Sequence, residues 1–179
     1  MKLNISLFKK GDIDKAIKEI EKYQQRLVNK TEIFIQRLAE IGVQVAKEAV
    51  ASGHGDSSKD MNFSISFTVE DAVFEGILSI SSTPQITDDG RVYYPHLGWE
   101  FGAGIHFNNG NINPKAHEFG MGVGTFPDQT HALSDYWWYR DSDGNLRLSQ
   151  GTEATMPMYK ASIAIMESIE NIAREVFKS

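Results

Sequence analysis

The sequence predicts an α+β fold in which a long N-terminal helix and a C-terminal helix pack on a small, mainly antiparallel β-sheet with a long central loop. Apolar residues recur at helical spacing at both ends of the chain, and they alternate with polar residues in two segments between the ends. Glycine and aromatic residues are concentrated in the centre. With 179 residues and 41% apolar content, one domain over residues 1–179 is expected.

The first predicted element is a helix from Asp12 to about Val50, where apolar residues return every three or four positions. Asp12 or Asp14 can accept hydrogen bonds from the free N–H groups of the first turn. Gln24 and Thr31 interrupt the apolar stripe, which favours a helix packed along its own domain over a long two-stranded coiled coil. A break near Asn29 is the alternative to one continuous helix.

Two hairpins and a final helix are predicted downstream. Residues Phe63–Val69 alternate between apolar and hydroxyl side chains, and Val73–Ser81 is the expected partner strand. Residues Tyr136–Arg140 and Leu146–Leu148 flank an Asp-Gly turn and predict a second hairpin. A helix is expected over Pro157–Phe177, because its apolar residues have helical spacing and proline suits the first helical position.

The overall composition argues against several classes of protein. A formal net charge of −6 gives no general affinity for nucleic-acid phosphates. The absence of cysteine rules out disulfides, thiolate metal sites and a cysteine nucleophile, and it is compatible with assembly in a reducing cytoplasm. No uncharged stretch approaches the roughly 18 residues of a membrane helix, and the N-terminus has no signal-peptide pattern, so neither membrane spanning nor standard secretion is expected.

A metal site is the first catalytic possibility to weigh. Potential ligands in the glycine-rich centre are Glu100, His106, His117, Glu118, Asp128 and His131. A helical zinc motif needs a second histidine after His117-Glu118, and none follows at that spacing. The histidines are therefore expected to face solvent or stabilise turns, and no metal is predicted.

A calcium loop is suggested by the alternating oxygen side chains of Asp141, Asp143 and Asn145. Such a loop requires glycine at its sixth position and glutamate at its twelfth, where this chain has Leu146 and Thr152. A tight hairpin turn explains the same residues.

The sequence contains no enzyme signature that stands out. Glycines at Gly102-Ala103-Gly104 are not followed by the lysine and hydroxyl residue of a phosphate-binding loop. No serine lies in a nucleophile elbow. Glu100 and Glu118 occur in similar Glu-Phe-Gly phrases, which leaves a carboxylate-dependent glycan hydrolase as a weak alternative. No cofactor and no catalytic residue are predicted.

Aromatic residues of the centre are the main candidates for subunit or partner contacts, with core packing as the alternative. Neighbouring residues of a strand point to opposite faces, so at least one of Trp137 and Trp138 needs a cover beyond its own hairpin. The contact candidates are Trp99, Phe101, Phe107, Phe119, Phe126, His131, Trp137 and Trp138.

The order of these features resembles the tail-completion and head–tail joining proteins of long-tailed bacteriophages, the gene-product-ten-like minor tail proteins. The matching phrases lie within residues 93–161, and the N-terminal helix adds only a general similarity. They are Glu100–Ile105, Gly124–Ala132, Trp137–Gly144 and Gly151–Ala161.

This resemblance implies a structural virion protein that is made in the host cytoplasm and joins copies of itself into a ring, for example a hexamer, in the tail or neck. The ring would bind phage connector proteins on one side and tail-tube or terminator proteins on the other, with DNA passing through its lumen. A tail-terminator ring, a metal- or carboxylate-dependent cell-wall hydrolase and a general interaction module that docks through its N-terminal helix are the alternatives.

Overall fold

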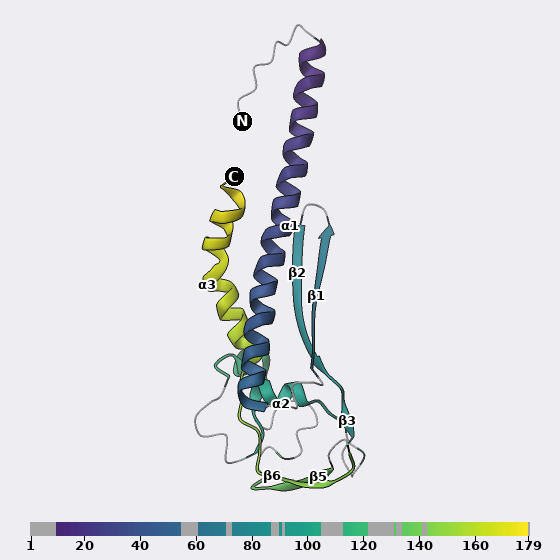
Figure 1. Cartoon of the computed structure of the whole chain (residues 1–179), viewed down its shortest axis with the longest axis vertical. Coiled ribbons are helices and arrows are strands. Elements are labelled where there is room, and N and C mark those ends of the chain that lie inside the picture. Colours follow the sequence, from purple (N-terminus) through teal and green to yellow (C-terminus); the bar gives the residue numbers. More distant parts are fainter. Residues whose placement is uncertain are drawn as a thin grey trace.

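The computed structural model describes residues 10–54, 61–70, 73–86, 90, 92–104, 113–121, 131, 134–140 and 143–178. The molecule is elongated, and helix α1 (Lys10–His54) runs along most of its length (Figure 1). Helix α3 (Pro157–Phe177) lies on one side of α1, and the hairpin of strands β1 (Met61–Glu70) and β2 (Val73–Ser82) lies on the other. The predicted α+β class is confirmed.

Helix α1 is continuous over 45 residues, so there is no break at Asn29. It begins two residues earlier than predicted, at Lys10, which places Asp12 inside the first turn. The N-terminal part of α1 projects beyond both α3 and the β1–β2 hairpin (Figure 1). This corrects the expectation that the whole helix packs along its own domain, because α3 and the hairpin are too short to cover it.

The contact between α1 and α3 is close and includes apolar side chains. The Phe34 and Phe177 rings meet with centroids 5.8 Å apart at the end of α3. Gly42 lies where α1 approaches α3 and the hairpin at once, since a Cβ there would be 2.7 Å from Ile165 Cδ1 and 2.8 Å from Leu78 Cδ2. The missing side chain at this position lets three elements pack together.

The β1–β2 hairpin is antiparallel, as predicted, and its register pairs Phe63 with Ile80 and Phe67 with Gly76. Every second residue of a strand points to the same face, and in this ladder one of the two faces is apolar. Gly76 brings this face close to α1, where a Cβ would lie only 2.5 Å from Ile35 Cγ2. The hairpin thus packs on α1 along one side.

The strands form three separate two-stranded ladders in the described part of the chain. Besides β1–β2, strand β3 (Gln85–Ile86) pairs with β4 (Val92–Tyr93), and β5 (Trp137–Arg140) pairs with β6 (Leu146–Ser149). The β5–β6 hairpin was predicted, whereas β3 and β4 are too short to show a period in the sequence. Helix α3 packs chiefly on α1 rather than on strands.

A short helix, α2 (Pro95–Phe101), lies within the segment predicted to be an irregular loop, residues 93–130. It has seven residues and begins with proline, and it is too short and too buried to show a one-sided apolar pattern. A 3₁₀ helix, η3 (Ala116–Phe119), follows. Residues 105–112 and 122–130 of the predicted loop lie outside the described residues.

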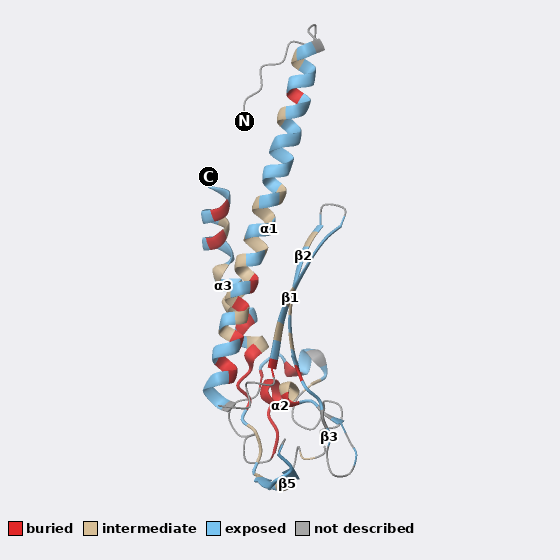
Figure 2. Ribbon diagram, turned by 45° about the vertical axis from the view of Figure 1, so that its right-hand side comes forward, coloured by how far each residue is buried: buried red, intermediate tan, exposed pale blue. Residues whose placement is uncertain are grey.

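The core is at the α2 end of the molecule. Buried Val50, Met61 and Trp99 form its centre, and Phe63 and Ile80 pack against them. Figure 2 shows that buried residues gather mostly around α2, the adjoining end of α1 and the start of α3. The two ends of this elongated molecule therefore differ in how far they are buried.

Candidate functional site

Glu100 of α2 stands at the centre of a polar junction, which we call the Glu100 junction. This buried carboxylate accepts a hydrogen bond from the Met158 N–H at 2.8 Å and one from the Tyr159 N–H at 3.0 Å. The Asn113 Nδ2 also donates to it at 2.6 Å. One side chain thus joins α2, the segment before η3 and the start of α3.

These hydrogen bonds provide the N-terminal cap of α3. Met156 occupies the N-cap position in a left-handed conformation and makes no side-chain capping bond. Pro157, the first helical residue, has no N–H, which leaves the N–H groups of Met158 and Tyr159 without partners inside the helix. The Glu100 carboxylate binds both, and its negative charge suits the positive end of the helix dipole.

Burial raises the pKa of Glu100 above its ordinary value, because removal from water disfavours the charged form. The hydrogen bonds from Met158, Tyr159 and Asn113 and the positive charge of Lys160 act in the opposite direction. The charged state of this carboxyl group therefore depends on the cap that it forms.

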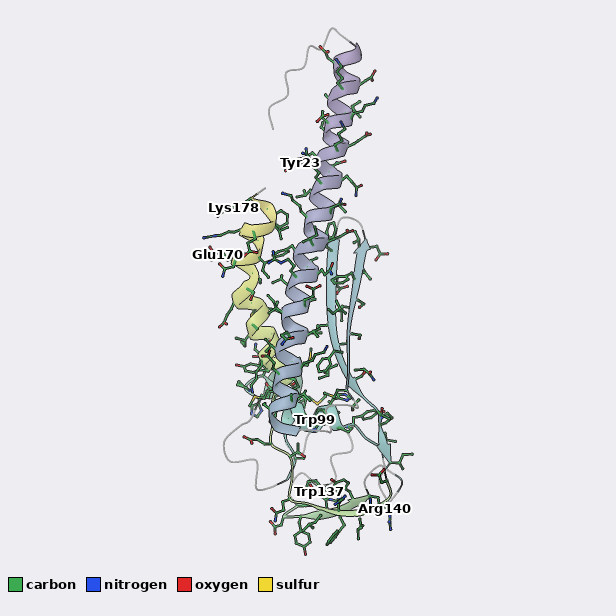
Figure 3. The ribbon with its side chains drawn as sticks, in the orientation of Figure 1. Tyr23, Trp99, Trp137, Arg140, Glu170 and Lys178 are labelled. Carbon is green, nitrogen blue, oxygen red and sulfur yellow. The ribbon has the colours of Figure 1, made fainter. Side chains whose placement is uncertain are left out.

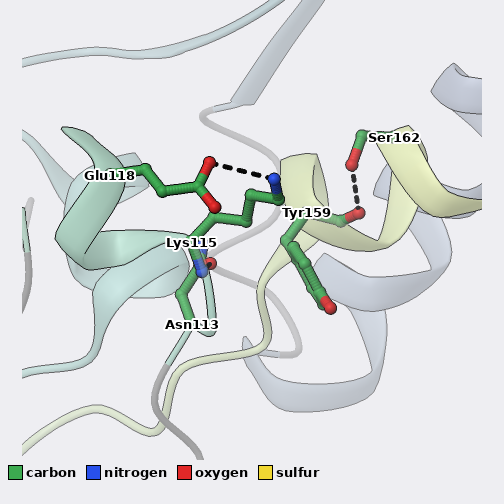
Figure 4. A network of polar contacts seen from close by, with 5 residues as sticks. All are labelled: Asn113, Lys115, Glu118, Tyr159 and Ser162. Carbon is green, nitrogen blue, oxygen red and sulfur yellow. Dashed lines mark hydrogen bonds and ion pairs between the residues drawn. The ribbon is translucent and has the colours of Figure 1, made fainter.

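Glu118 has a different environment from Glu100, although both occur in a Glu-Phe-Gly phrase. Its carboxylate is exposed and forms an ion pair with Lys115 at 2.9 Å (Figure 4). In the same view the Ser162 hydroxyl donates to the Tyr159 carbonyl at 2.7 Å. The buried carboxylate is engaged by helix α3 and the other by a surface lysine, which lends no support to the two acting as a catalytic pair on a glycan.

Backbone contacts of Trp99 extend the junction. Its carbonyl oxygen accepts hydrogen bonds from the N–H groups of Thr155 and Met156 at 2.9 and 3.0 Å. One residue beyond Gly102, Ala103 pairs with Thr152 in an isolated antiparallel bridge through bonds of 2.9 and 2.8 Å. The chain leading into α3 is therefore fastened to the end of α2 by its backbone.

Glycine is required at Gly104 because the two segments approach closely. Its φ is +86°, and a Cβ there would lie 2.8 Å from the Gly151 Cα. Two of the phrases that carry the phage resemblance, Glu100–Ile105 and Gly151–Ala161, thus meet in space through their described residues. Their spacing in the sequence reflects a structural contact.

A cavity of about 320 Å³ lies beside the junction. Its walls are Ile80, His96, Leu97, Glu100, Phe101, Asn113, Lys115, Met158, Tyr159 and Ser162. His96 Nδ1 lies 2.8 Å from the Ser82 hydroxyl, and burial lowers the pKa of His96 below its ordinary value. The neutral form of the imidazole is therefore favoured in the folded chain.

Two predicted contact residues lie in the core of the subunit itself. Trp99 and Phe101 are only 5% and 8% exposed. Trp99 packs with Val50 and Met61, and Phe101 packs with Ala116. This corrects the expectation that they contact a partner, since α2 turns both rings toward the interior.

His131, Trp137 and Trp138 lie at the β5–β6 hairpin. Trp137 is half-buried and its ring stacks on His131 with centroids 4.8 Å apart, whereas Trp138 is exposed. The two tryptophans therefore differ in cover, and whether another subunit covers Trp138 stays a prediction. The backbone of Phe119 lies in η3, but its side chain lies outside the described residues, as do Phe107 and Phe126.

The outer face of the β5–β6 hairpin is apolar and exposed. Trp138 pairs with Leu148, and Leu146, two residues before Leu148, shares its face. Tyr136 lies just before the strand, two residues from Trp138, and so continues the same face. These four residues, the β5–β6 patch, are each at least half exposed: Tyr136 62%, Trp138 56%, Leu146 52% and Leu148 50%. Only Trp138 had been predicted as a contact, and the hairpin register would have found the others.

A second apolar surface lies on the projecting part of α1. Ile13, Ile17, Ile20 and Leu27, which we call the α1 stripe, are between 39% and 49% exposed. They continue the line of residues that α3 covers further along the helix. The helical periodicity of the sequence predicts this stripe, but the expected packing of α1 along its own domain would have buried it. The β5–β6 patch and the α1 stripe lie at opposite ends of the molecule (Figure 3).

Comparison with known proteins adds no family: no protein-family model, curated protein or solved structure matches the chain. Among the described residues, no three His, Cys, Asp or Glu side chains gather as a possible metal site. His106, Asp128 and Asp141 from the sequence-based candidates lie outside those residues. No helix in the described ranges is long and apolar enough to cross a membrane.

Proposed function

We propose that this chain is a structural virion protein of a long-tailed phage or prophage that forms or completes a ring at the head–tail junction. Copies of the chain would contact one another around the ring. Connector proteins would bind one side of the ring and tail-tube or terminator proteins the other, and DNA would pass through the lumen.

The observation that carries this proposal is the pair of uncovered apolar surfaces at opposite ends of an elongated subunit. Contiguous apolar side chains on a soluble protein mark contact sites, because covering them removes apolar area from water. Tyrosine and tryptophan, which occur in the β5–β6 patch, are the residue types enriched at the energetic centres of interfaces. Contacts between different surfaces of identical subunits generate a ring when the rotation between neighbours closes.

The Glu100 junction gives the proposal its second support. The Glu-Phe-Gly, Gly-Thr and Met-Pro phrases that resemble the tail-completion family contact one another through backbone bonds and the Glu100 cap. Contacts between these phrases are what a shared architecture would require. The resemblance therefore bears on architecture, and it implies no catalytic residue.

Interrupting the gene in a phage or lysogen that carries it tests this function. We expect DNA-filled heads and tails to accumulate separately, and a plasmid copy of the wild-type gene to restore joined virions. A plasmid copy with Trp138→Ala and Leu148→Ala should fail to restore joining, although its circular dichroism matches that of the wild type. Ser64→Ala, an exposed change on the β1–β2 hairpin, is the matched control and should complement fully.

Two other results would count against head–tail joining. Normal yields of joined virions from the interrupted gene would refute it. Tails of irregular length in the same mutant would instead assign the chain to a tail-terminator ring.

A further inference from the structure

We propose that the projecting α1 segments of two copies pair in antiparallel orientation, so that the α1 stripe of each copy covers that of the other. This two-fold contact belongs to the free subunit and occupies the α1 stripe, so it must open before the stripe takes part in a ring. It does not depend on the head–tail role. It gives the free subunit a way to bury the apolar surface that its own fold leaves exposed.

The uncovered stripe continues an interface that already exists in the subunit. Ile13, Ile20 and Leu27 are followed at the same seven-residue step by Phe34, whose ring contacts Phe177 of α3. From Phe34 toward His54, α3 packs along α1. From Phe34 toward Lys10, no described element packs on the stripe. The exposed stripe therefore has the spacing of a helix–helix seam, which another helix fits.

A second copy supplies such a helix because the stripe is narrow and self-complementary. Most of the other exposed residues on the projecting helix are charged or polar, among them Lys15, Lys18, Glu21 and Lys22, although Tyr23 is also 49% exposed. A contact between identical patches across a two-fold axis covers both stripes at once. A helix without an apolar seam of its own would bury less apolar area here.

The position of α3 selects the antiparallel orientation. In every copy α3 covers the α1 seam from Phe34 toward the core, so two α1 helices side by side in parallel register would bring two α3 helices into the same space. In the antiparallel arrangement the two bodies lie at opposite ends of the pair. Figure 1 shows that the projecting part of α1 extends clear of α3 and the hairpin.

The end of α3 also limits the register. Alternating seam positions face each other in antiparallel helix pairs, and we take the longest overlap that stays clear of Phe34, which places Ile17 opposite Ile20 of the second copy. In this register Lys10 of the second copy lies opposite Leu27, short of Phe177. A longer overlap of one heptad would drive that helix start against the end of α3.

Charges beside the seam make a prediction specific to this orientation. Asp14 and Glu21 lie on the same flank of the stripe, and antiparallel pairing brings Asp14 of one copy near Glu21 of the other. Like charges weaken the association, although Lys18 lies between them on each helix. In a parallel pair, Glu21 would instead lie near Ala16, so reversing its charge would change little.

The chain has no cysteine, so introduced cysteines report the contact directly. Equal amounts of Ile17→Cys and Ile20→Cys proteins are mixed and oxidised, and the linked dimer is followed on non-reducing gels. We expect the mixed disulfide to form several times faster than the self-linked dimer of either variant, because only the mixed pair faces across the seam. Lys22→Cys, on the outer face of the helix, is the control and should link slowest.

Sedimentation of Glu21→Lys gives the second readout, and we expect a larger dimer fraction than for wild type at equal concentration. Lys22→Glu is the charge-change control and should leave the dimer fraction unchanged. The pairing would be overturned if one cysteine variant linked fastest with itself, or if the mixed disulfide formed no faster than that of Lys22→Cys. It would also be overturned if Glu21→Lys did not increase the dimer fraction. If the phage still joins heads and tails after such a result, the proposed function stands and only this contact is refuted.

Discussion

The two ends of the molecule differ in how far their apolar side chains are buried. At the α2 end, short irregular elements bury their side chains, and the polar groups of Glu100, Asn113 and the start of α3 satisfy one another. At the other end, α1 is long and regular, yet its apolar stripe is exposed. Regularity in the sequence predicts where a helix forms, and it does not predict what covers the helix.

From this contrast we expect the α2 end to determine stability and the projecting end of α1 to serve assembly. Stability is concentrated where backbone and side-chain donors and acceptors meet inside a core, because an unpaired buried polar group is costly. The exposed stripe contributes little to the isolated subunit, since an exposed side chain gains little from folding. Substitutions at the two ends should therefore separate stability from assembly.

Replacing Glu100 should have the largest effect on stability. In Glu100→Gln one oxygen becomes an amide nitrogen that faces the N–H donors of α3, so we expect a loss of about 2–3 kcal/mol in the free energy of unfolding. Urea denaturation measures it, with Glu118→Gln as the matched change in the second Glu-Phe-Gly phrase, expected within about 0.5 kcal/mol of wild type. Equal stability of the two variants would show that Glu100 does not cap α3.

A smaller loss is expected where the β1–β2 hairpin approaches α1. Gly76→Ala places a methyl group 2.5 Å from Ile35 Cγ2 and should cost about 1–2 kcal/mol through overpacking. Combining it with Ile35→Ala should return part of that loss, because the double variant removes the clash. Gly11→Ala, where a Cβ meets nothing within 4 Å, serves as the control. Strict additivity of the two changes would contradict this contact.

Acid should weaken the α2 end through His96. The folded-state pKa of His96 is lowered, so its contribution to stability is complete above the unfolded value of 6.5 and is lost as the pH falls through the lowered value. The raised pKa of Glu100 acts oppositely, since its contribution is present below 4.5 and is lost as the pH rises through the folded value. His96→Gln should therefore reduce the fall in stability below pH 6.5, as followed by urea denaturation at several pH values. An unchanged pH profile in this variant would show that His96 does not cause the loss of stability in acid.

The smallest effect on the free energy of unfolding is expected at the projecting end. Ile17→Gln should change the unfolding free energy of the monomer by no more than about 0.5 kcal/mol, because the side chain is 49% exposed. The same variant should reduce dimer formation in sedimentation experiments. A loss as large as that of Glu100→Gln would mean that the stripe is part of the subunit core.

Periodicity explains which parts of the fold were predictable from the sequence. Helices α1 and α3 and the β1–β2 and β5–β6 hairpins each repeat a local pattern over enough residues to be recognised. Helix α2 has only seven residues and is buried, so no one-sided pattern marks it. Trp99 and Phe101 were candidates for partner contacts, with core packing as the alternative, and the structure places them in the core.

The role of Glu100 was beyond local sequence reasoning. Its hydrogen-bond partner Met158 lies 58 positions away along the chain. A proline preceded by a residue without a capping side chain, as in Met156-Pro157, is the one local sign that α3 takes its cap from elsewhere. The exposed surfaces were recognised as apolar patterns, but their exposure depends on where α3 and the hairpins end.

The most direct test of the central claim, that the uncovered ends serve assembly, is to measure the mass and shape of the protein alone and with the tails of a phage that carries its gene. Native mass spectrometry and electron microscopy would compare the purified chain alone with the chain mixed with purified tails from a mutant lacking it. We predict a closed ring of defined copy number, in solution or at the head-proximal tail end, that is lost in the Trp138→Ala, Leu148→Ala variant. A chain that remains a monomer at every concentration and leaves the tails bare would contradict it.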